Sequence, residues 1–250
     1  MSFWRDFLDT VHPLPDSGVD GPLPPLMLAL TLVTGLVDAT SYLRIGHVFV
    51  ANMTGNVVFL GFAIAGAKGL SVEESLVALA AFLIGGLIAG RLGIRLAHHR
   101  GLLLRAALSV QLVFLAAAAV VAAATHAGTH IGGGTRYLLI VLLAVGMGIQ
   151  NATVRRIGVR DLMTTVLTMT LTGIAADAKV IGGPGSAVAR RILSIGAMVI
   201  GALIGALLVL HVDDFAPLAV AAGLVALTAL AAHRVSRRPG SWAKPAKPGA

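Results

Sequence analysis

Residues 192–210 read ILSIGAMVIGALIGALLVL, nineteen consecutive positions without a charged side chain. A helix needs about 20 mostly apolar residues to cross the hydrocarbon core of a bilayer. Five further runs have the same character, and only the first of them contains a charge, the carboxyl of Asp38. They cover residues 26–43, 76–90, 106–125, 137–149 and 215–232. We therefore predict an all-α integral membrane protein whose main partner is the lipid bilayer.

The composition agrees with this class and excludes several others. Of 250 residues, 57% are hydrophobic and 12% are charged, against about 25% charged in an ordinary soluble domain. The net charge is +8, but the basic residues lie between apolar runs, which indicates topology determinants and no nucleic-acid partner. The chain has no cysteine, hence no disulfide framework and no thiol nucleophile. Because we find no nucleophile–base pair either, we expect no enzyme, no cofactor and no metal.

The two halves of the chain resemble each other. Asp38-Ala39-Thr40 recurs as Asn151-Ala152-Thr153 after 113 positions, and the 84–88 stretch IGGLI recurs as IGALI after 116. Self-similarity of this kind is typical of internally duplicated membrane proteins. The predicted organisation is a polar leader, two membrane repeats and a basic tail that we expect to be disordered. These parts cover residues 1–25, 26–126, 136–233 and 234–250.

Each predicted repeat holds four apolar segments, and the distribution of Lys and Arg tests how many of the eight cross the membrane. If all cross, the 19 basic residues divide 11 to 8 between the two faces, which is almost no bias. If segments two (48–67) and six (162–182) enter and leave by one face, the division is 16 to 3. A seven-crossing arrangement with an outside N-terminus gives the same ratio. We therefore predict six to seven transmembrane helices, with segments two and six re-entrant or broken.

Segments two and six also carry the polar residues. Hydroxyl and amide groups there indicate either a solute site or hydrogen bonds between helices, and the sequence leaves these two roles open. Asn52 and Asn56 would share one face of a helix, unless Gly55 breaks it. The predicted substrate-binding residues are Asp38, Asn52, Thr54, Gly55, Asn56, Gln150, Asn151, Thr165 and Thr168.

Asp38 is the most informative single residue. An acid within an apolar span is costly and is by default a functional candidate. The second repeat has Asn151 at the equivalent position, so one half would hold an ionisable group and the other a neutral amide. This asymmetry suits proton or cation coupling. The alternative is a buried structural pair between Asp38 and an arginine, such as Arg44.

Four stretches resemble the YoaK family of bacterial multi-pass membrane proteins, which is classed as a domain of unknown function. They are residues 35–39 (GLVDA), 49–56 (FVANMTGN), 150–152 (QNA) and 164–168 (TTVLT). The resemblance covers about residues 25–233, and it implies a location in the bacterial cytoplasmic membrane. It supplies no substrate.

Our leading functional hypothesis is a transporter or permease-like protein for a small solute, with a coupling ion as a further partner. The alternative is a non-transporting membrane interaction or assembly protein, in which the polar residues only hold helices together. GxxxG spacing at Gly86–Gly90 and Gly201–Gly205 predicts close helix packing and is compatible with a homodimer.

Overall fold

The computed structural model describes residues 3–13, 20–96, 98–125, 132–159, 162, 164, 167–176, 188–237 and 240–244. Within this part of the chain, six helices are long and apolar enough to cross a membrane, and no strand occurs. They are α2 with η1 (Leu23–Gly46), α4 (Val72–Arg95), α5 (Arg100–Thr125), α6 (Gly133–Ile157), α8 (Val188–His211) and α9 (Phe215–Ser236). The all-α membrane class is confirmed.

Segments two and six are the ones that do not form long helices. Segment two contains α3 (Met53–Ile64), and segment six contains α7 (Leu167–Ala176). At 1.5 Å per residue, twelve residues of helix span about 18 Å, well short of the ~30 Å hydrocarbon core. As described, neither short helix is long enough to cross a bilayer by itself, and the described residues contain six candidate spans, the lower of the two predicted numbers.

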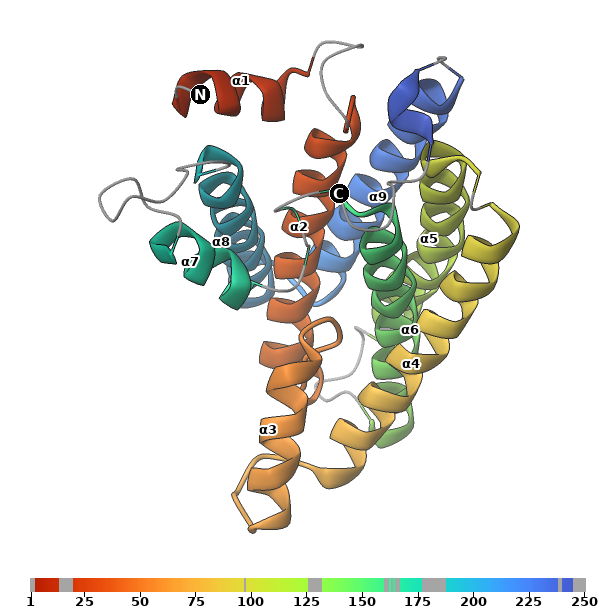
Figure 1. Cartoon of the computed structure of the whole chain (residues 1–250). Helices are drawn as coiled ribbons and strands as arrows, with labels where there is room; N and C mark the ends of the chain where they lie inside the picture. Colours follow the sequence, from red (N-terminus) through yellow and green to blue (C-terminus); the bar gives the residue numbers. More distant parts are fainter. Residues whose placement is uncertain are drawn as a thin grey trace.

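Both ends of segment two lie on the same side of the bundle. Gly46, at the end of η1, packs directly against the side chain of Glu74, in the first turn of α4. Glu74 also forms an ion pair with Arg136 at the start of α6, with 3.1 Å between Nη1 and Oε1. Arg44 pairs with Asp214, just before α9. The starts of α4, α6 and α9 thus gather around the end of α2, and segment two is re-entrant (Figure 1).

The opposite end of the bundle is held by a separate ionic cluster. Asp20 precedes α2 and pairs with Arg100 at the start of α5, at 3.2 Å, and with Arg190 at the start of α8, at 3.0 Å. Arg156, in the last turn of α6, lies against Gly93 near the end of α4. Since α6 ends and α8 begins at this same end, segment six also leaves and enters the bundle on one side.

The termini cover this second end. The short helix α1 (Phe3–Val11) lies across it, and Asp6 accepts a hydrogen bond from the Ala189 backbone at the start of α8 (Figure 1). In the basic tail, η3 (Ser241–Ala243) buries Trp242 against Gly21 and Gly101. Residues 241–243 therefore pack against the bundle in the described part of the tail.

Three helix pairs make the most extensive contacts: α4 with α6, α2 with α8, and α5 with α9. In the predicted repeats, α2, α4 and α5 correspond to α6, α8 and α9. If each helix is exchanged for its counterpart, these three pairs are converted into one another. Exchange turns the α4–α6 pair into the α8–α2 pair and leaves α5–α9 as itself. The duplication remains an interpretation, and this arrangement supports it.

Four glycines show the same correspondence at atomic level. A Cβ at Gly85 would collide with the Val145 carbonyl, and one at Gly148 with the Phe82 carbonyl, where α4 meets α6. In the α2–α8 contact, a Cβ at Gly201 would collide with the Leu32 carbonyl, and one at Gly35 with the Met198 carbonyl. The contacts correspond residue by residue: Gly85 and Phe82 lie 116 positions before Gly201 and Met198, and Gly148 and Val145 lie 113 positions after Gly35 and Leu32.

The two predicted GxxxG motifs differ in what they contact. Gly201 and Gly205 both pack against the backbone of α2. A Cβ at Gly86 or Gly90 would meet no atom within 4 Å, so the expectation of close packing is wrong for this motif within the protein. Gly85 makes the close contact instead.

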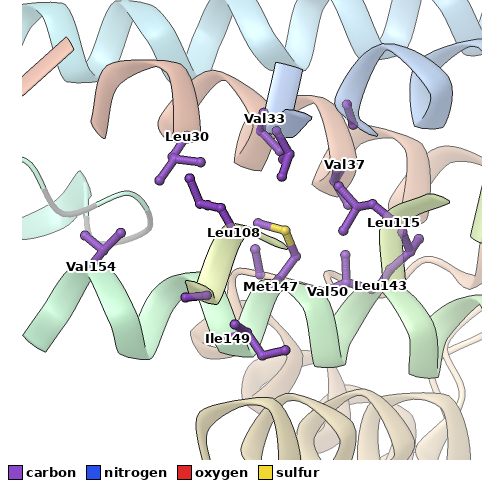
Figure 2. Close-up of a cluster of buried hydrophobic side chains, with 14 of the residues drawn as sticks. Leu30, Val33, Val37, Val50, Leu108, Leu115, Leu143, Met147, Ile149 and Val154 are labelled. Atoms are coloured by element: carbon purple, nitrogen blue, oxygen red, sulfur yellow. The ribbon is translucent and has the colours of Figure 1, made fainter. Parts of the chain in front are cut away.

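The apolar core lies between α2, α5 and α6 (Figure 2). It is formed by fully buried side chains such as Leu30, Val37, Leu108, Leu143 and Met147. Large apolar side chains on the outer faces of α4 and α8 are exposed instead, including Leu87 at 72% and Leu203 at 56%. This division is expected of a helix bundle whose outer surface contacts lipid.

Candidate functional site

The chain reverses direction directly after the first span. η1 is a π-helical turn, and His47 then adopts a left-handed backbone conformation with φ of 54°. Residues 48–52 are not helical and run back beside α2, since the Ser41 hydroxyl donates to the Val48 carbonyl at 2.8 Å. Non-helical backbone at membrane depth needs partners from the protein itself or from water. Besides Ser41, two further side chains supply them.

Asp38 is the first of these side chains. Its Oδ1 accepts hydrogen bonds from the backbone N–H groups of Val50, at 2.9 Å, and Ala51, at 2.8 Å. The residue is buried, with 8% of its surface exposed. The proposed pairing with Arg44 is wrong, because Arg44 binds Asp214 through an Nε–Oδ1 distance of 2.6 Å. No ion pair among the described residues includes Asp38.

Asn56 is the second. Its Oδ1 accepts from the Phe49 backbone N–H at 2.8 Å, and its Nδ2 donates to the Phe49 carbonyl at 2.5 Å. The side chain is completely buried. Asn56 therefore holds residue 49 as a neighbouring strand would, and its amide is used by the fold.

Asn52 and Asn56 consequently do not share a helix face. α3 begins at Met53, and Asn52 is the exposed residue that precedes it, with no side-chain capping bond. The break lies at 47–52 and not at Gly55, which is helical. Gly55 has a packing role, because a Cβ there would collide with the ring of Phe49.

A cavity of about 740 Å³ lies where the re-entrant segment meets α2, α7 and α8. This volume is within the range of small-molecule sites, about 300–1,000 Å³. Its described lining residues are Thr34, Gly35, Asp38, Ala39, Tyr42, Leu43, Phe49, Asn52, Thr54, Gly55, Val58, Phe59, Thr168, Met198, Ala202 and Ala206.

Five of the predicted site residues line this cavity: Asp38, Asn52, Thr54, Gly55 and Thr168. Thr54 and Thr168 occupy equivalent places, in the first turns of α3 and α7, and lie 114 positions apart. The wall thus combines residues from both predicted repeats.

The other predicted residues are not among the described residues that line the cavity. Gln150 belongs to a buried network in which its Nε2 donates to the Thr34 hydroxyl at 2.9 Å and its Oε1 accepts from Gln111 at 2.8 Å. It therefore supports the cavity wall through Thr34 without being among the residues that line the cavity. Asn151 lies on α6 and is not among the described lining residues either. Thr165 lies outside the part of the chain that the structure describes.

Sequence reasoning missed an aromatic cluster in the wall. Tyr42, Phe49 and Phe59 have ring centroids 5.1, 5.6 and 5.8 Å apart, and all three line the cavity. Tyr42 follows Asp38 by one helical turn, which was a usable signal. The approach of Phe49 and Phe59 depends on the chain reversal and has no local signature.

A family model described as "Protein of unknown function (DUF1275)" matches residues 26–231, which include every described residue of the cavity wall. The chain belongs to the DUF1275 family. This chain is also similar to the UPF0700 transmembrane protein YoaK of Bacillus subtilis (strain 168), with 35% identity over 152 residues. That match spans 61% of this chain and 65% of the relative, slightly less than two thirds of it. No solved structure matches the chain. The resemblance to the YoaK family is confirmed, and with it a multi-pass transmembrane protein.

Proposed function

We propose that the protein is a permease-like carrier of a small solute, which binds in the cavity beside Asp38. The observation that carries this proposal is the cavity itself, which lies at the break in the membrane-embedded backbone. In secondary transporters, discontinuous helices at the interface of two repeats form the substrate site. Here Thr54 and Thr168 face one cavity from the first turns of the two short helices.

The packing of the wall suits alternating access. Met198, Ala202 and Ala206 of α8 line the cavity, and Gly35, Gly201 and Gly205 pack directly against the facing backbone in the α2–α8 contact. Small residues let helices pack closely along a smooth surface. A modest rotation of α8 and α7 against α2 and α3 would open the cavity toward one side or the other.

The charges propose an orientation. The end held by Asp20, Arg100 and Arg190 carries further basic residues in the last turns of α4, α6 and α9, namely Arg95, Arg155, Arg156 and Arg234. The other end carries Arg44 and Arg136. Under the positive-inside rule, the Asp20 end faces the cytoplasm of a bacterial cell and both termini are cytoplasmic.

The alternative function, a non-transporting interaction protein, is favoured by one observation. Asp38 and Asn56 are both engaged in holding backbone groups of residues 49–51. A purely structural role for these two residues leaves the exposed hydroxyls of Thr54 and Thr168 without a purpose, and these therefore decide between the two functions.

The experiment is solute flux into liposomes that contain the purified protein, across a panel of cationic, neutral and anionic metabolites. Thr54→Val and Thr168→Val remove cavity hydroxyls that make no hydrogen bond among the described residues, so both variants are expected to fold. Thr125→Val, at the end of α5, removes a hydroxyl bonded to the Val121 carbonyl and serves as the control. The proposal expects a flux that the cavity variants reduce and the control preserves. Absence of flux for every class would favour the interaction protein. Equal flux in all variants would refute the assignment of this cavity as the solute path.

A further inference from the structure

The described cavity wall carries one acid, Asp38, which forms no ion pair with a described basic residue. Asp38 is the only charged side chain among the described lining residues. At this end of the bundle, Glu74 pairs with Arg136 and Asp214 pairs with Arg44. A charge in a site of low dielectric attracts an opposite charge far more strongly than it does in water. The electrostatics of the cavity therefore favour a cation.

The fold uses only part of the acceptor capacity of the Asp38 carboxyl, although the Asn52 backbone N–H also interacts with it. Both hydrogen bonds from the Val50 and Ala51 backbone end on Oδ1, and neither uses Oδ2. These bonds fix the orientation of the carboxylate, as supporting hydrogen bonds do in binding sites. The side chain lines the cavity, so Oδ2 is available to a ligand.

An aromatic wall stands beside this carboxylate. Tyr42 lies one turn after Asp38 on the same helix, and Phe49 precedes Val50, whose N–H binds Asp38. Phe59 completes the cluster, with its ring 5.6 Å from that of Phe49. Aromatic faces attract cations within about 6 Å of the ring, and combinations of several rings recognise alkylated ammonium groups.

The same wall is poorly suited to a metal ion. Ca²⁺ takes six to eight oxygen ligands and Mg²⁺ requires near-octahedral oxygen coordination. The described residues contain no cluster of three His, Asp or Glu side chains. Most of the lining is instead apolar, including Val58, Met198 and Ala202. An organic cation would bury its apolar part against these side chains, whereas a hydrated metal ion would not.

The geometry points to a small organic ammonium ion as the solute of this cavity, with its charged group between Asp38 Oδ2 and the rings of Tyr42, Phe49 and Phe59. This inference rests on the proposal that the cavity is the solute site. It adds the class of solute, and it assigns the three aromatic residues a binding role.

The test measures the charge preference of the cavity without requiring the natural solute. The chain has no cysteine, so Thr54→Cys places a single thiol in the cavity wall. Its rate of modification is measured with two methanethiosulfonate reagents of similar size, one carrying trimethylammonium and one carrying sulfonate. The matched control is Ala67→Cys, an exposed position in the loop after α3.

The expected ratio of cationic to anionic rates is about tenfold or more higher at residue 54 than at residue 67, equivalent to an electrostatic preference of about 1.4 kcal/mol. Asp38→Asn keeps an oxygen acceptor for the Val50 and Ala51 amides and removes the charge, so it is expected to abolish this difference. It leaves the ratio at residue 67 unchanged. Phe59→Leu is expected to lower the ratio about two- to fivefold, since exposed cation–π contacts contribute about 0.5–1 kcal/mol.

Equal ratios at residues 54 and 67, or a preference that survives Asp38→Asn, would overturn the ammonium assignment. A preference unaffected by Phe59→Leu would overturn the aromatic contribution. The liposome experiment tests the carrier proposal separately. Flux of only an anionic or neutral solute would support a carrier but refute its specificity for ammonium ions. Asp38-dependent cation preference without flux of any amine would retain the binding site and refute transport.

Discussion

Asn52→Ala and Asn56→Ala form a matched pair, because the same change four residues apart has opposite structural consequences. Asn56→Ala removes both hydrogen bonds to the Phe49 backbone and leaves a part-buried N–H and a part-buried carbonyl without these partners. An unsatisfied buried polar group costs about 1–3 kcal/mol. The two groups together predict a loss of about 2–6 kcal/mol in the free energy of unfolding. If the bonds are worth only what measured hydrogen bonds between membrane helices are, about 0.6 kcal/mol each, the loss is still about 1 kcal/mol.

Asn52→Ala removes an exposed side chain that makes no capping bond. Surface changes of this kind usually stay within about 0.5 kcal/mol. The assay is unfolding of purified protein by titration of a denaturing detergent into mixed micelles, followed by circular dichroism. Equal losses of unfolding free energy in the two variants would refute the assigned roles. A larger loss for Asn52→Ala would show that the start of α3 and the fold-back of residues 47–52 are described incorrectly.

The remaining predictions concern helix packing and topology. Gly201→Ala would force the α2 backbone away from α8 and is expected to cost about 1–3 kcal/mol of unfolding free energy; Gly196→Ala, on the same helix and in open space, is expected to stabilise by about 0.5–1 kcal/mol. Similar effects of both glycine substitutions in the same unfolding assay would contradict the close contact. For topology, an impermeant thiol reagent added to intact cells is expected to label Ala67→Cys and not Ser241→Cys. Labelling of both or of neither would contradict an odd number of crossings between these positions, and the reverse pattern would invert the orientation.

The long helices were predictable from the sequence because their signal is local. A run of apolar residues as long as 192–210 is stable only in a membrane or in a buried core. The re-entrant character of segment two was also accessible, because the bias in Lys and Arg left six or seven crossings and the predicted repeat favours equal treatment of segments two and six. Its atomic form was not. The bonds of Asp38 to Val50 and Ala51 exist only because the chain reverses at His47, and no period in the sequence reports that reversal.

The errors have similar causes. Successive helix residues differ by about 100° in direction, so a shift of one position, from Gly86 to Gly85, moves a glycine from the outer face to the α4–α6 contact. Arg44 was close to Asp38 in sequence, but its partner, Asp214, is 170 residues away. Such long-range pairs depend on how helices pack together, and a single sequence does not contain that information in local form.

The central claim is that polar residues of segments two and six face one water-accessible cavity inside the membrane. Its most direct test is the modification rate of Thr54→Cys and Thr168→Cys in native membranes by a small neutral, water-soluble thiol reagent. Leu83→Cys and Leu203→Cys, on the exposed apolar faces of α4 and α8, are the lipid-facing comparison. Thiols react as thiolates and need water, so rapid modification of both cavity positions and slow modification of both lipid-facing positions is predicted. Equally slow modification at all four positions would contradict the cavity and, with it, the proposed carrier.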